Sequence, residues 1–386
     1  MTRTILAVTG IRSEYDIMCP VFRAIENHPG LSLKLLVTGA HLSQSFGYTI
    51  EQIRRDGFEI ADEVESLING DSKSSRVKGA AVQLSGIIQT ATRVKPDFLM
   101  VLGDREESIT TALAGTYMDI PIAHLCGGDR VIGNVDDVVR HAVTKLAHVH
   151  LTTNEESRER ILKLGEEEFR VFNVGNPGLD RFAEIPQMSR VELFRWYGFA
   201  AKKESNPLLV VVQHALSSEA ESAYGQMKET MEAIIGTGYP TVVSYPNSDA
   251  GGEGLIRCIE EYRHVECIKI FKNVPRVQFV NTLRHAACLI GNSSLGIMEA
   301  PFLKLPAINV GNRQKGRLCG DNMIFTVHKR EHIADSIKTA CFDERFRAAV
   351  RAGKSPYGDG RSSDRIVKIL ADISIDEKLL VKEIAY

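Results

Sequence analysis

The sequence lacks the features by which several broad classes of protein are recognised. Its 47 basic and 49 acidic residues give a formal net charge of −2, so no excess of positive charge indicates nucleic acid or a membrane as a partner. It contains no apolar run of membrane-spanning length and no signal-peptide pattern. Its seven cysteines form no CxxC pair, which is typical of a reduced chain. We therefore expect a cytoplasmic protein.

What the chain does contain is an alternation of short apolar runs and amphipathic segments. Continuous apolar strands separated by helical patterns are typical of a parallel, doubly wound sheet. The pattern predicts strands in two groups, within 4–10, 32–41, 97–104, 121–125 and 148–153, and then within 207–214, 241–249, 266–273, 288–294 and 306–313.

The break between these groups predicts two domains in a chain of 386 residues. We expect an α/β fold with a Rossmann-like domain at 1–185, a second at 205–360, and a helical tail at 361–386 that crosses back to the first. Small or polar residues end nearly every expected strand. Because ligands bind at the carboxyl ends of such strands, we expect the site in an interdomain cleft.

The second domain carries a candidate nucleotide site at "IGNSSLGIMEA" (290–300). Ser293 and Ser294 are natural N-cap residues, and free backbone N–H groups at a helix start favour a diphosphate. Glu299, one turn into the expected helix, can accept hydrogen bonds from a ribose hydroxyl pair. An ordinary capped helix would have the same sequence, but Arg313 after a later strand adds a cation suited to phosphate.

Two further strand ends add candidate binding residues. His214 follows an apolar strand and can donate to the same diphosphate, although a lone histidine is often structural. Asn247 lies in "YPNSDAGGEG" (245–254), a composition that is also typical of an ordinary turn.

The first domain carries the candidate chemistry. Arg12 stands at the first strand–helix junction and suits a phosphate, unless it is a solvated loop residue. Asp104 directly follows an apolar strand and Gly103, so we expect it to point into the site. The neighbouring Glu106 and Glu107 are typical of a helix N-terminal turn.

The stretch "HLCGGDRVIGNVDDVVRHAVTKLAH" (124–148) is the densest cluster of titratable residues. Asp136 and Asp137 begin an expected helix that also carries Arg140 and His141. The cluster can be read as a capped helix with i,i+4 pairs. We also expect it to share a site with Asp104, because neighbouring carboxyls divide acid and base roles.

Taken together, these motifs resemble the hydrolysing UDP-N-acetylglucosamine 2-epimerases, and among them the sialic and legionaminic acid pathway branch. The resemblance spans almost the whole chain. It rests on "TGIRSEYD", "VTGAHLSQSFGYT", "LGDR", "GNVDDVVRHAVTKLAH", "VGNPGLD", "QH", "YPNSDAG", "GNSSLGIMEAP", "VGNRQKGR" and "YGDGRSSDRI".

The resemblance implies a GT-B-like fold, a UDP-sugar substrate, no metal or redox cofactor, and a homodimer or homotetramer. It also implies an elimination followed by a hydration, which releases UDP and a 2-epimerised free sugar. Asp104 and Asp136 would be the acid/base carboxyls, with His141 orienting one of them. UDP and sugar would be held by Arg12, Arg105, His214, Asn247, Ser293, Ser294, Glu299 and Arg313.

The chain departs from that branch at Cys126, where the resemblance implies a glutamate before the Gly-Gly pair. Cys126 could be inert packing, Asp129 could take over the lost role, or Cys126 could act as an acid/base thiol. Neighbouring aspartates disfavour the last alternative because they oppose thiolate formation. The lost charge suggests a bulkier or less polar sugar, such as a UDP- or GDP-linked diacetamido-6-deoxy sugar.

Two alternatives from other classes remain open. A GT-B glycosyltransferase shares the fold and the nucleotide site but needs fewer carboxyls in the first domain. A nucleotide-sugar binding protein with reduced catalysis would account for the missing glutamate.

Overall fold

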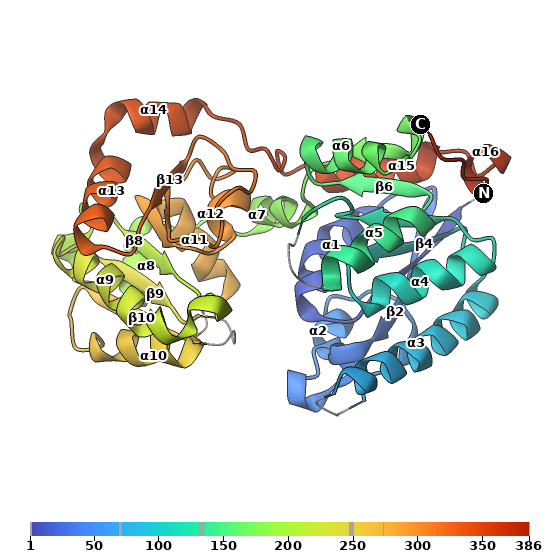
Figure 1. The fold of residues 1–386 in the computed structure, drawn as a ribbon, viewed down its shortest axis with the longest axis horizontal. Helices are drawn as coiled ribbons and strands as arrows, with labels where there is room; N and C mark the ends of the chain where they lie inside the picture. The colour runs from blue at the N-terminus through green and yellow to red at the C-terminus, as the bar shows by residue number, and fades with distance from the viewer. Residues whose placement is uncertain (1, 69–71, 131–134, 247–250, 273, 386) are drawn as a thin grey trace. The chain divides into compact units, whose positions relative to one another are not determined.

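The computed structural model describes residues 2–68, 72–130, 135–246, 251–272 and 274–385. The chain divides into two compact units, one made of Met1–Ala183 with Tyr357–Tyr386 and the other of Glu184–Pro356. Each unit is a parallel sheet with helices on both faces (Figure 1). Helix α7 (Asp180–Glu184) spans the point where the chain leaves the first unit.

The sheet of the first unit has seven parallel strands in the order β3-β2-β1-β4-β5-β6-β7. The strands are β1 Arg3–Thr9, β2 Leu31–Thr38, β3 Ile60–Val64, β4 Phe98–Leu102, β5 Ile122–Leu125, β6 Val149–Thr152 and β7 Val171–Asn173.

Alternate residues of the central strands enter two different cores, as the period of two in a strand requires. In β1, Ile5 and Ala7 pack with α1 and α15, whereas Leu6 and Val8 pack with α3, α4 and α5. The helices of the first unit are α1 Arg12–Glu26, α2 Ile50–Arg55, α3 Lys73–Val94, α4 Glu106–Tyr117, α5 Val135–Leu146, α6 Glu155–Lys163, α15 Ser362–Asp372 and α16 Glu377–Leu380. Its 3-10 segments are η1 Gly39–Leu42, η2 Gln44–Phe46, η3 Glu168–Arg170 and η4 Pro177–Leu179.

The C-terminal segment completes the first unit. The Asp180 carboxylate accepts hydrogen bonds from the backbone N–H groups of Ser362 (3.0 Å) and Ser363 (2.6 Å) and so caps the start of α15. Further on, Lys382 donates to the carbonyls of Lys145 (2.7 Å) and Ala147 (2.6 Å) at the end of α5. The chain end therefore fixes the helix that carries the predicted carboxyls.

The second unit has six parallel strands in the order β10-β9-β8-β11-β12-β13. Val243 of β9 packs with α9, α10 and α13, and Val242 packs with α8 on the other face. The strands are β8 Leu209–Val212, β9 Thr241–Ser244, β10 Ile268–Phe271, β11 Cys288–Gly291, β12 Ala307–Val310 and β13 Met323–Thr326. The helices are α8 Arg190–Tyr197, α9 Ala223–Ile235, α10 Gly252–Glu261, α11 Arg276–His285, α12 Leu295–Met298, α13 Arg330–Phe342 and α14 Glu344–Ala352, with 3-10 segments η5 Ala201–Lys203 and η6 Ser217–Ser222.

Each strand expected from the sequence coincides with a strand of the structure, but the sheets also contain β3, β7 and β13. All three are edge strands, and none is an unbroken buried run. In the described part of the chain, no helix is both long and apolar enough to cross a membrane.

Candidate functional site

In the first unit, Asp104 lies in the turn between β4 and α4, at the carboxyl edge of the sheet. The turn is built on Gly103, whose φ of 78° is available to glycine at little cost. Gly103 donates its N–H to the Leu125 carbonyl (2.9 Å), and its own carbonyl is 2.7 Å from His124 Nε2. Strand β5 therefore fixes the backbone that presents Asp104.

Arg140 of α5 connects the segment that follows β4 with the segment that follows β5. Its guanidinium donates to the Asp104 carboxylate, and its Nη1 lies 3.6 Å from Asp129 Oδ2 and donates to the Cys126 carbonyl (3.1 Å). Arg140 is only 7% exposed, so this charge is strongly felt by both carboxylates. The structure thus brings Asp104 and Asp129 together around one cation.

Asp129 is also held from the other side. Its Oδ1 accepts hydrogen bonds from Thr153 Oγ1 (3.1 Å) and Ser157 Oγ (2.5 Å) near the start of α6. A carboxylate bound on both oxygens has little freedom to change its orientation.

The first turn of α5 carries the other predicted acids. Asp136 Oδ1 lies 3.7 Å from Arg76 Nη2, and Arg76 also donates to Glu106. His141 Nε2 lies 3.7 Å from Asp137 Oδ2, one turn along the same helix. Asp137 and His141 therefore form an i,i+4 pair of the kind that the capped-helix interpretation predicts.

Cys126 belongs to the hydrophobic core that contains β1 and α1, and its side chain is buried. Burial raises the pKa of its thiol, and the negative charge of Asp129 raises it further. Its φ of 59° is in the left-handed region, which non-glycine residues rarely adopt. These observations favour packing over an acid/base role for this thiol.

A buried pair of glutamates beside Arg105 was not expected from the sequence. Glu14 and Glu107 are each 5% exposed, and Arg105 Nε lies 3.8 Å from Glu14 Oε1 and 3.3 Å from Glu107 Oε2. Burial raises the pKa of both carboxyls, and the charge of Glu107 raises that of Glu14 further. Glu107 is thus not a solvated residue of a helix start. The bare Cα of Gly10, against which its carboxyl packs, is the one sequence signal for its burial.

Arg12 occupies the predicted strand–helix junction as the first residue of α1. Its side chain is 59% exposed, and its Nε lies 3.7 Å from Asp16 Oδ2. This arginine is therefore accessible to a ligand at the carboxyl edge of β1.

In the second unit, His214 lies two residues beyond β8. Its backbone N–H donates to Asn292 Oδ1 (2.7 Å), and its carbonyl accepts from Asn292 Nδ2 (2.9 Å). Asn292 directly follows β11, so its side chain fastens the loop after β8 to the loop after β11.

The turn that follows β11 is tighter than the sequence suggests. Gly291 has a φ of 132°, and a side chain there would overlap the Val212 carbonyl. Ser294 is the N-cap residue of α12 but makes no side-chain cap hydrogen bond, whereas Ser293 Oγ accepts from Leu295 N (3.4 Å). Their hydroxyls and the first N–H groups of α12 lie at one strand end.

Helix α12 is a single turn, so Glu299 does not lie inside a helix as predicted but at its C-cap. The helix ends because the chain turns into Pro301 two residues later. Glu299 Oε2 is buried without a hydrogen-bond partner among the described residues. Burial raises the pKa of Glu299 to about 7, although Arg276 and Arg317 oppose the shift.

Arg313 follows β12 and donates to the Asn292 carbonyl (3.2 Å), which also accepts from Gln314 Nε2 (2.8 Å). The structure therefore gathers His214, Ser293 and Arg313 around Asn292. Asn247 lies outside the described residues.

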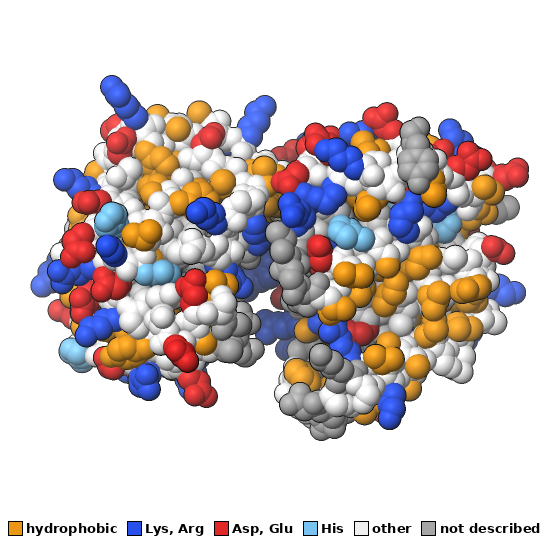
Figure 2. All heavy atoms as spheres, viewed as in Figure 1, with side chains coloured by type: hydrophobic (Ala, Val, Ile, Leu, Met, Phe, Trp, Pro, Cys, Tyr) orange, Lys and Arg blue, Asp and Glu red, His pale blue; other side chains and the backbone are white. Residues whose placement is uncertain are grey.

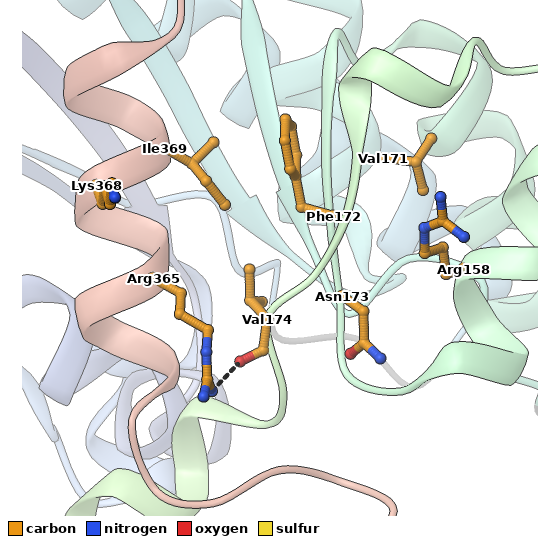
Figure 3. A pocket seen from close by; sticks show the side chains of 8 residues that line it. All are labelled: Arg158, Val171, Phe172, Asn173, Val174, Arg365, Lys368 and Ile369. Carbon is orange, nitrogen blue, oxygen red and sulfur yellow. Dashed lines mark hydrogen bonds between the residues drawn. The ribbon is translucent and has the colours of Figure 1, made fainter.

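A cavity of about 400 Å³ lies elsewhere on the first unit (Figure 3). None of the predicted site residues lines it. In Figure 3, Arg365 of α15 points toward the Val174 carbonyl, to which it donates (3.2 Å). The residues that line the cavity are Arg158, Val171, Phe172, Asn173, Val174, Arg365, Lys368 and Ile369.

Within the described residues, no group of three His, Cys, Asp or Glu side chains is arranged to hold a metal ion.

The fold is similar to that of solved nucleotide-sugar epimerases. The crystal structure of UDP-GlcNAc 2-epimerase from Neisseria meningitidis, bound to UDP-GlcNAc, aligns with a TM-score of 0.77 over 96% of this chain and 100% of that chain, at 17% identity. This likeness confirms the predicted fold class, a GT-B-like pair of Rossmann-type domains.

The sequence comparisons give the family. The family model described as UDP-N-acetylglucosamine 2-epimerase matches residues 23–371. The UDP-N,N'-diacetylbacillosamine 2-epimerase (hydrolyzing) of Legionella pneumophila is 32% identical over 386 residues, 100% of each chain. The GDP/UDP-N,N'-diacetylbacillosamine 2-epimerase (hydrolyzing) of Campylobacter jejuni is 32% identical over 325 residues, 83% of this chain and 84% of that one.

The chain belongs to the UDP-N-acetylglucosamine 2-epimerase family. The prediction of a hydrolysing nucleotide-sugar 2-epimerase is thereby confirmed, and the glycosyltransferase alternative gains no support.

Proposed function

We propose that the chain acts on a UDP- or GDP-linked diacetamido-trideoxy sugar and releases the nucleoside diphosphate and the free 2-epimerised sugar. The observation that best supports a proton-transfer site is the Arg140 cluster, in which the carboxylates of Asp104 and Asp129 both lie next to the buried guanidinium of Arg140. The sugar is supported by the two 32% identical relatives, both named as diacetylbacillosamine 2-epimerases.

The reaction proceeds in two stages. A carboxylate removes the proton from C2 of the sugar while the C1–O bond breaks and the nucleoside diphosphate leaves, which gives a 2-acetamidoglucal. Water then adds at C1, and a proton returns to C2 on the opposite face. General acid–base groups of this kind contribute roughly 10²–10⁴-fold each to a rate.

The first unit supplies the acid and the base in this proposal. Asp104 and Asp136 exchange protons with the sugar and the water. Asp129 takes the place of the glutamate that the family resemblance implies, since it shares Arg140 with Asp104. His141 positions the start of α5 through Asp137, and Arg12 and Arg105 contact the diphosphate or the sugar.

The second unit binds the nucleotide. The hydroxyls of Ser293 and Ser294 and the N–H groups that follow them suit a diphosphate. His214 and Arg313 offset the charge that develops on the leaving group. Glu299 accepts the ribose hydroxyls, and its unpartnered, buried Oε2 supports this role. Asn247 remains a predicted contact of the nucleotide sugar.

Cys126 bears on the choice of sugar. The chain has a neutral, buried thiol where the family resemblance implies a glutamate, so one negative charge is missing next to the Arg140 cluster, whose arginine donates to the Cys126 carbonyl. This favours a ring substituent that is bulkier or less polar than the hydroxyl groups of N-acetylglucosamine.

A panel of UDP- and GDP-sugars, followed by NMR for release of free sugar, tests the function. We expect free 2-epimerised sugar, with the diacetamido nucleotide sugars turned over fastest. A clear preference for UDP-GlcNAc would contradict the proposed sugar. A transferred glycoside would indicate a glycosyltransferase, and retained binding without turnover would indicate a binding protein.

We also propose that two copies of the chain associate through the first unit. Figure 2 shows hydrophobic side chains gathered over α3, α4 and α5 on the viewed face. Exposed apolar side chains that cluster on one face favour an interaction site, and a second copy of the chain is the simplest partner. The exposed side chains are Val77, Val82 and Ile88 of α3, Leu113 and Tyr117 of α4, and Val135 and Val138 of α5.

Light scattering after size exclusion tests the assembly. We expect a dimer or tetramer of the 42.7 kDa chain, which Tyr117→Glu dissociates. The control Phe342→Glu, at an exposed apolar residue of the second unit, should leave the mass unchanged. A wild-type chain that is monomeric at every concentration rules out the proposal.

We propose that the protein works in the cytoplasm. All seven cysteines are free thiols, which supports a reducing, cytoplasmic location. Expression of the tagged chain in bacteria, followed by fractionation, tests this part of the proposal.

A further inference from the structure

Three backbone segments of the second unit meet at a single asparagine, Asn292. The first is the loop after β8, whose His214 exchanges two hydrogen bonds with the Asn292 amide (2.7 and 2.9 Å). The second is the turn after β11, to which Asn292 itself belongs. The third is the loop after β12, whose Gln314 and Arg313 donate to the Asn292 carbonyl (2.8 and 3.2 Å).

An amide side chain matches the hydrogen-bonding groups at this position. Asn292 is 5% exposed, and it satisfies one backbone donor and one backbone acceptor of the same residue. The amide of Asn or Gln carries both functions on one neutral planar group and does so at every pH, without a change of tautomer or protonation. Removing this group takes away the two hydrogen bonds that the amide makes with the backbone of His214 in a partly buried place.

The neighbouring glycine places the amide where it is needed. Gly291 has a φ of 132°, and its Cα packs against the Val212 carbonyl. The Asn292 N–H then donates to the same carbonyl (3.3 Å). The turn therefore crosses over the end of β8, and the Asn292 side chain reaches His214 of the adjoining loop.

We propose that Asn292 is a positioning residue for nucleotide binding: it holds His214, Ser293 and Arg313 in the arrangement that a nucleoside diphosphate requires. The inference rests on the proposed function, since these three residues are the nucleotide ligands there. Asn292 acts through them and makes no contact with the reacting atoms of the sugar.

The same unit offers a matched control in Asn281 of α11. Asn281 is fully buried, its Oδ1 accepts from Met188 N (3.0 Å), and its Nδ2 donates to the Pro186 carbonyl (2.9 Å). It thus ties one segment to another by the same kind of reciprocal amide bonding. None of the predicted nucleotide ligands takes part in those bonds.

The experiment measures the affinity of the full-length chain for UDP and GDP by calorimetry, together with kcat and KM on the best sugar of the panel. We expect Asn292→Ala to weaken nucleotide binding by about 10–100-fold, the consequence of unpairing buried polar groups. KM should rise by a similar factor, and kcat should fall as well, because His214 and Arg313 also offset the charge that develops on the leaving diphosphate. Asn281→Ala should lower the unfolding midpoint and leave the affinity within about twofold.

A second variant keeps the test decisive if Asn292→Ala does not fold. Gln314→Met removes the shorter of the two donors to the Asn292 carbonyl, leaves the Arg313 donor in place, and also removes the acceptor of Arg317. We expect a loss of affinity of about three- to tenfold. Unchanged affinity in Asn292→Ala or Gln314→Met, or an equal loss in Asn281→Ala, overturns the inference alone. A wild-type chain that binds neither UDP nor GDP contradicts the proposed function as well.

Discussion

The carboxyl edges of the two sheets carry different kinds of polar group. In the first unit the strand ends present carboxylates and guanidiniums, with Asp104 and Asp129 on Arg140 and Glu14 and Glu107 beside Arg105. In the second unit the contacts at the strand ends run largely through amides, hydroxyls and backbone groups, organised by Asn292.

The difference teaches how one architecture supports two tasks. A site that moves protons needs titratable groups whose charges are balanced against one another. A site that binds a diphosphate needs fixed donors and few carboxylates. Each sheet presents its loops at the same edge, so the residue types in those loops decide the task.

The largest effect is expected from neutralising Asp104. Asp104→Asn keeps the shape of the side chain but removes its ability to accept a proton, so kcat/KM should fall by about 10³-fold or more. Binding of UDP should stay unchanged, because the second unit carries the nucleotide ligands. Free-sugar release and calorimetry measure the two quantities.

Asp97→Asn is the control for this variant. Asp97 precedes the other end of β4 and accepts a hydrogen bond from Thr4 N (2.7 Å). It should keep full activity, and full activity in Asp104→Asn would disprove the assigned role.

The next largest effect is expected on the free energy of unfolding, when a buried charge of the first unit loses its partner. Lys382 lies 2.8 Å from Glu166, whose carboxyl is almost fully buried. Burial alone would raise the pKa of Glu166, but hydrogen bonds from His150, Lys145 and Lys382 lower it to about 2. Lys382→Met should therefore reduce the free energy of unfolding by about 2–4 kcal/mol, because it leaves a buried carboxylate short of a partner.

Urea unfolding measures this loss. The neutral counterpart Asn281→Ala in the second unit should cost about 1–2 kcal/mol. If Lys382→Met and Asn281→Ala reduced the free energy of unfolding equally, the buried charges of the first unit would contribute no more to stability than the buried amide of the second.

A smaller effect is expected from Glu299, the buried acid among the groups of the second unit. Its folded-state pKa of about 7 lies above the ordinary 4.5, so the stability linked to its neutral form is present below pH 4.5 and is lost as the pH rises through 7. The ionised carboxylate accepts ribose hydroxyls more strongly than the neutral acid does, so UDP binding should tighten by up to about tenfold between pH 6 and pH 8.

Glu299→Gln should flatten this part of the pH dependence. Titrating the variant and the wild type with the same nucleotide cancels the ionisation of the ligand itself. An identical pH profile for both proteins would exclude Glu299 from ribose binding.

The smallest effect is expected at Cys126. Because its thiol is buried and its pKa is raised, it cannot supply the thiolate that acid/base work requires. Cys126→Ala should keep kcat/KM within about threefold on the preferred sugar. A loss of 100-fold or more would instead make this thiol part of the chemistry.

The central part of each sheet could be predicted from the sequence because its strands are buried on both faces and form unbroken apolar runs. Strands β3, β7 and β13 could not. They lie at sheet edges and are only partly buried. Strand β3 contains two acidic residues, β7 has only three residues, and the apolar run of β13 is limited to residues 323–325.

The candidate site divides in the same way. The positions of Asp104, Arg12 and His214 follow from strand ends, which the sequence reveals. The burial of Glu14 and Glu107 depends on tertiary contacts at Gly10, whose N–H donates to the Glu14 carboxyl and whose bare Cα packs against the Glu107 carboxyl. No local sequence pattern contains the contact with Glu107. The role of Asn292 depends on a hydrogen bond across 78 residues of sequence, which local patterns do not contain.

Proton NMR of the reaction in D₂O tests the proposed chemistry at the reacting carbon. The elimination and hydration predict one solvent deuterium at C2 of the released sugar, an inverted configuration at that carbon, and one nucleoside diphosphate per sugar. A product that retains the original hydrogen at C2, or that keeps its configuration there, would contradict the account.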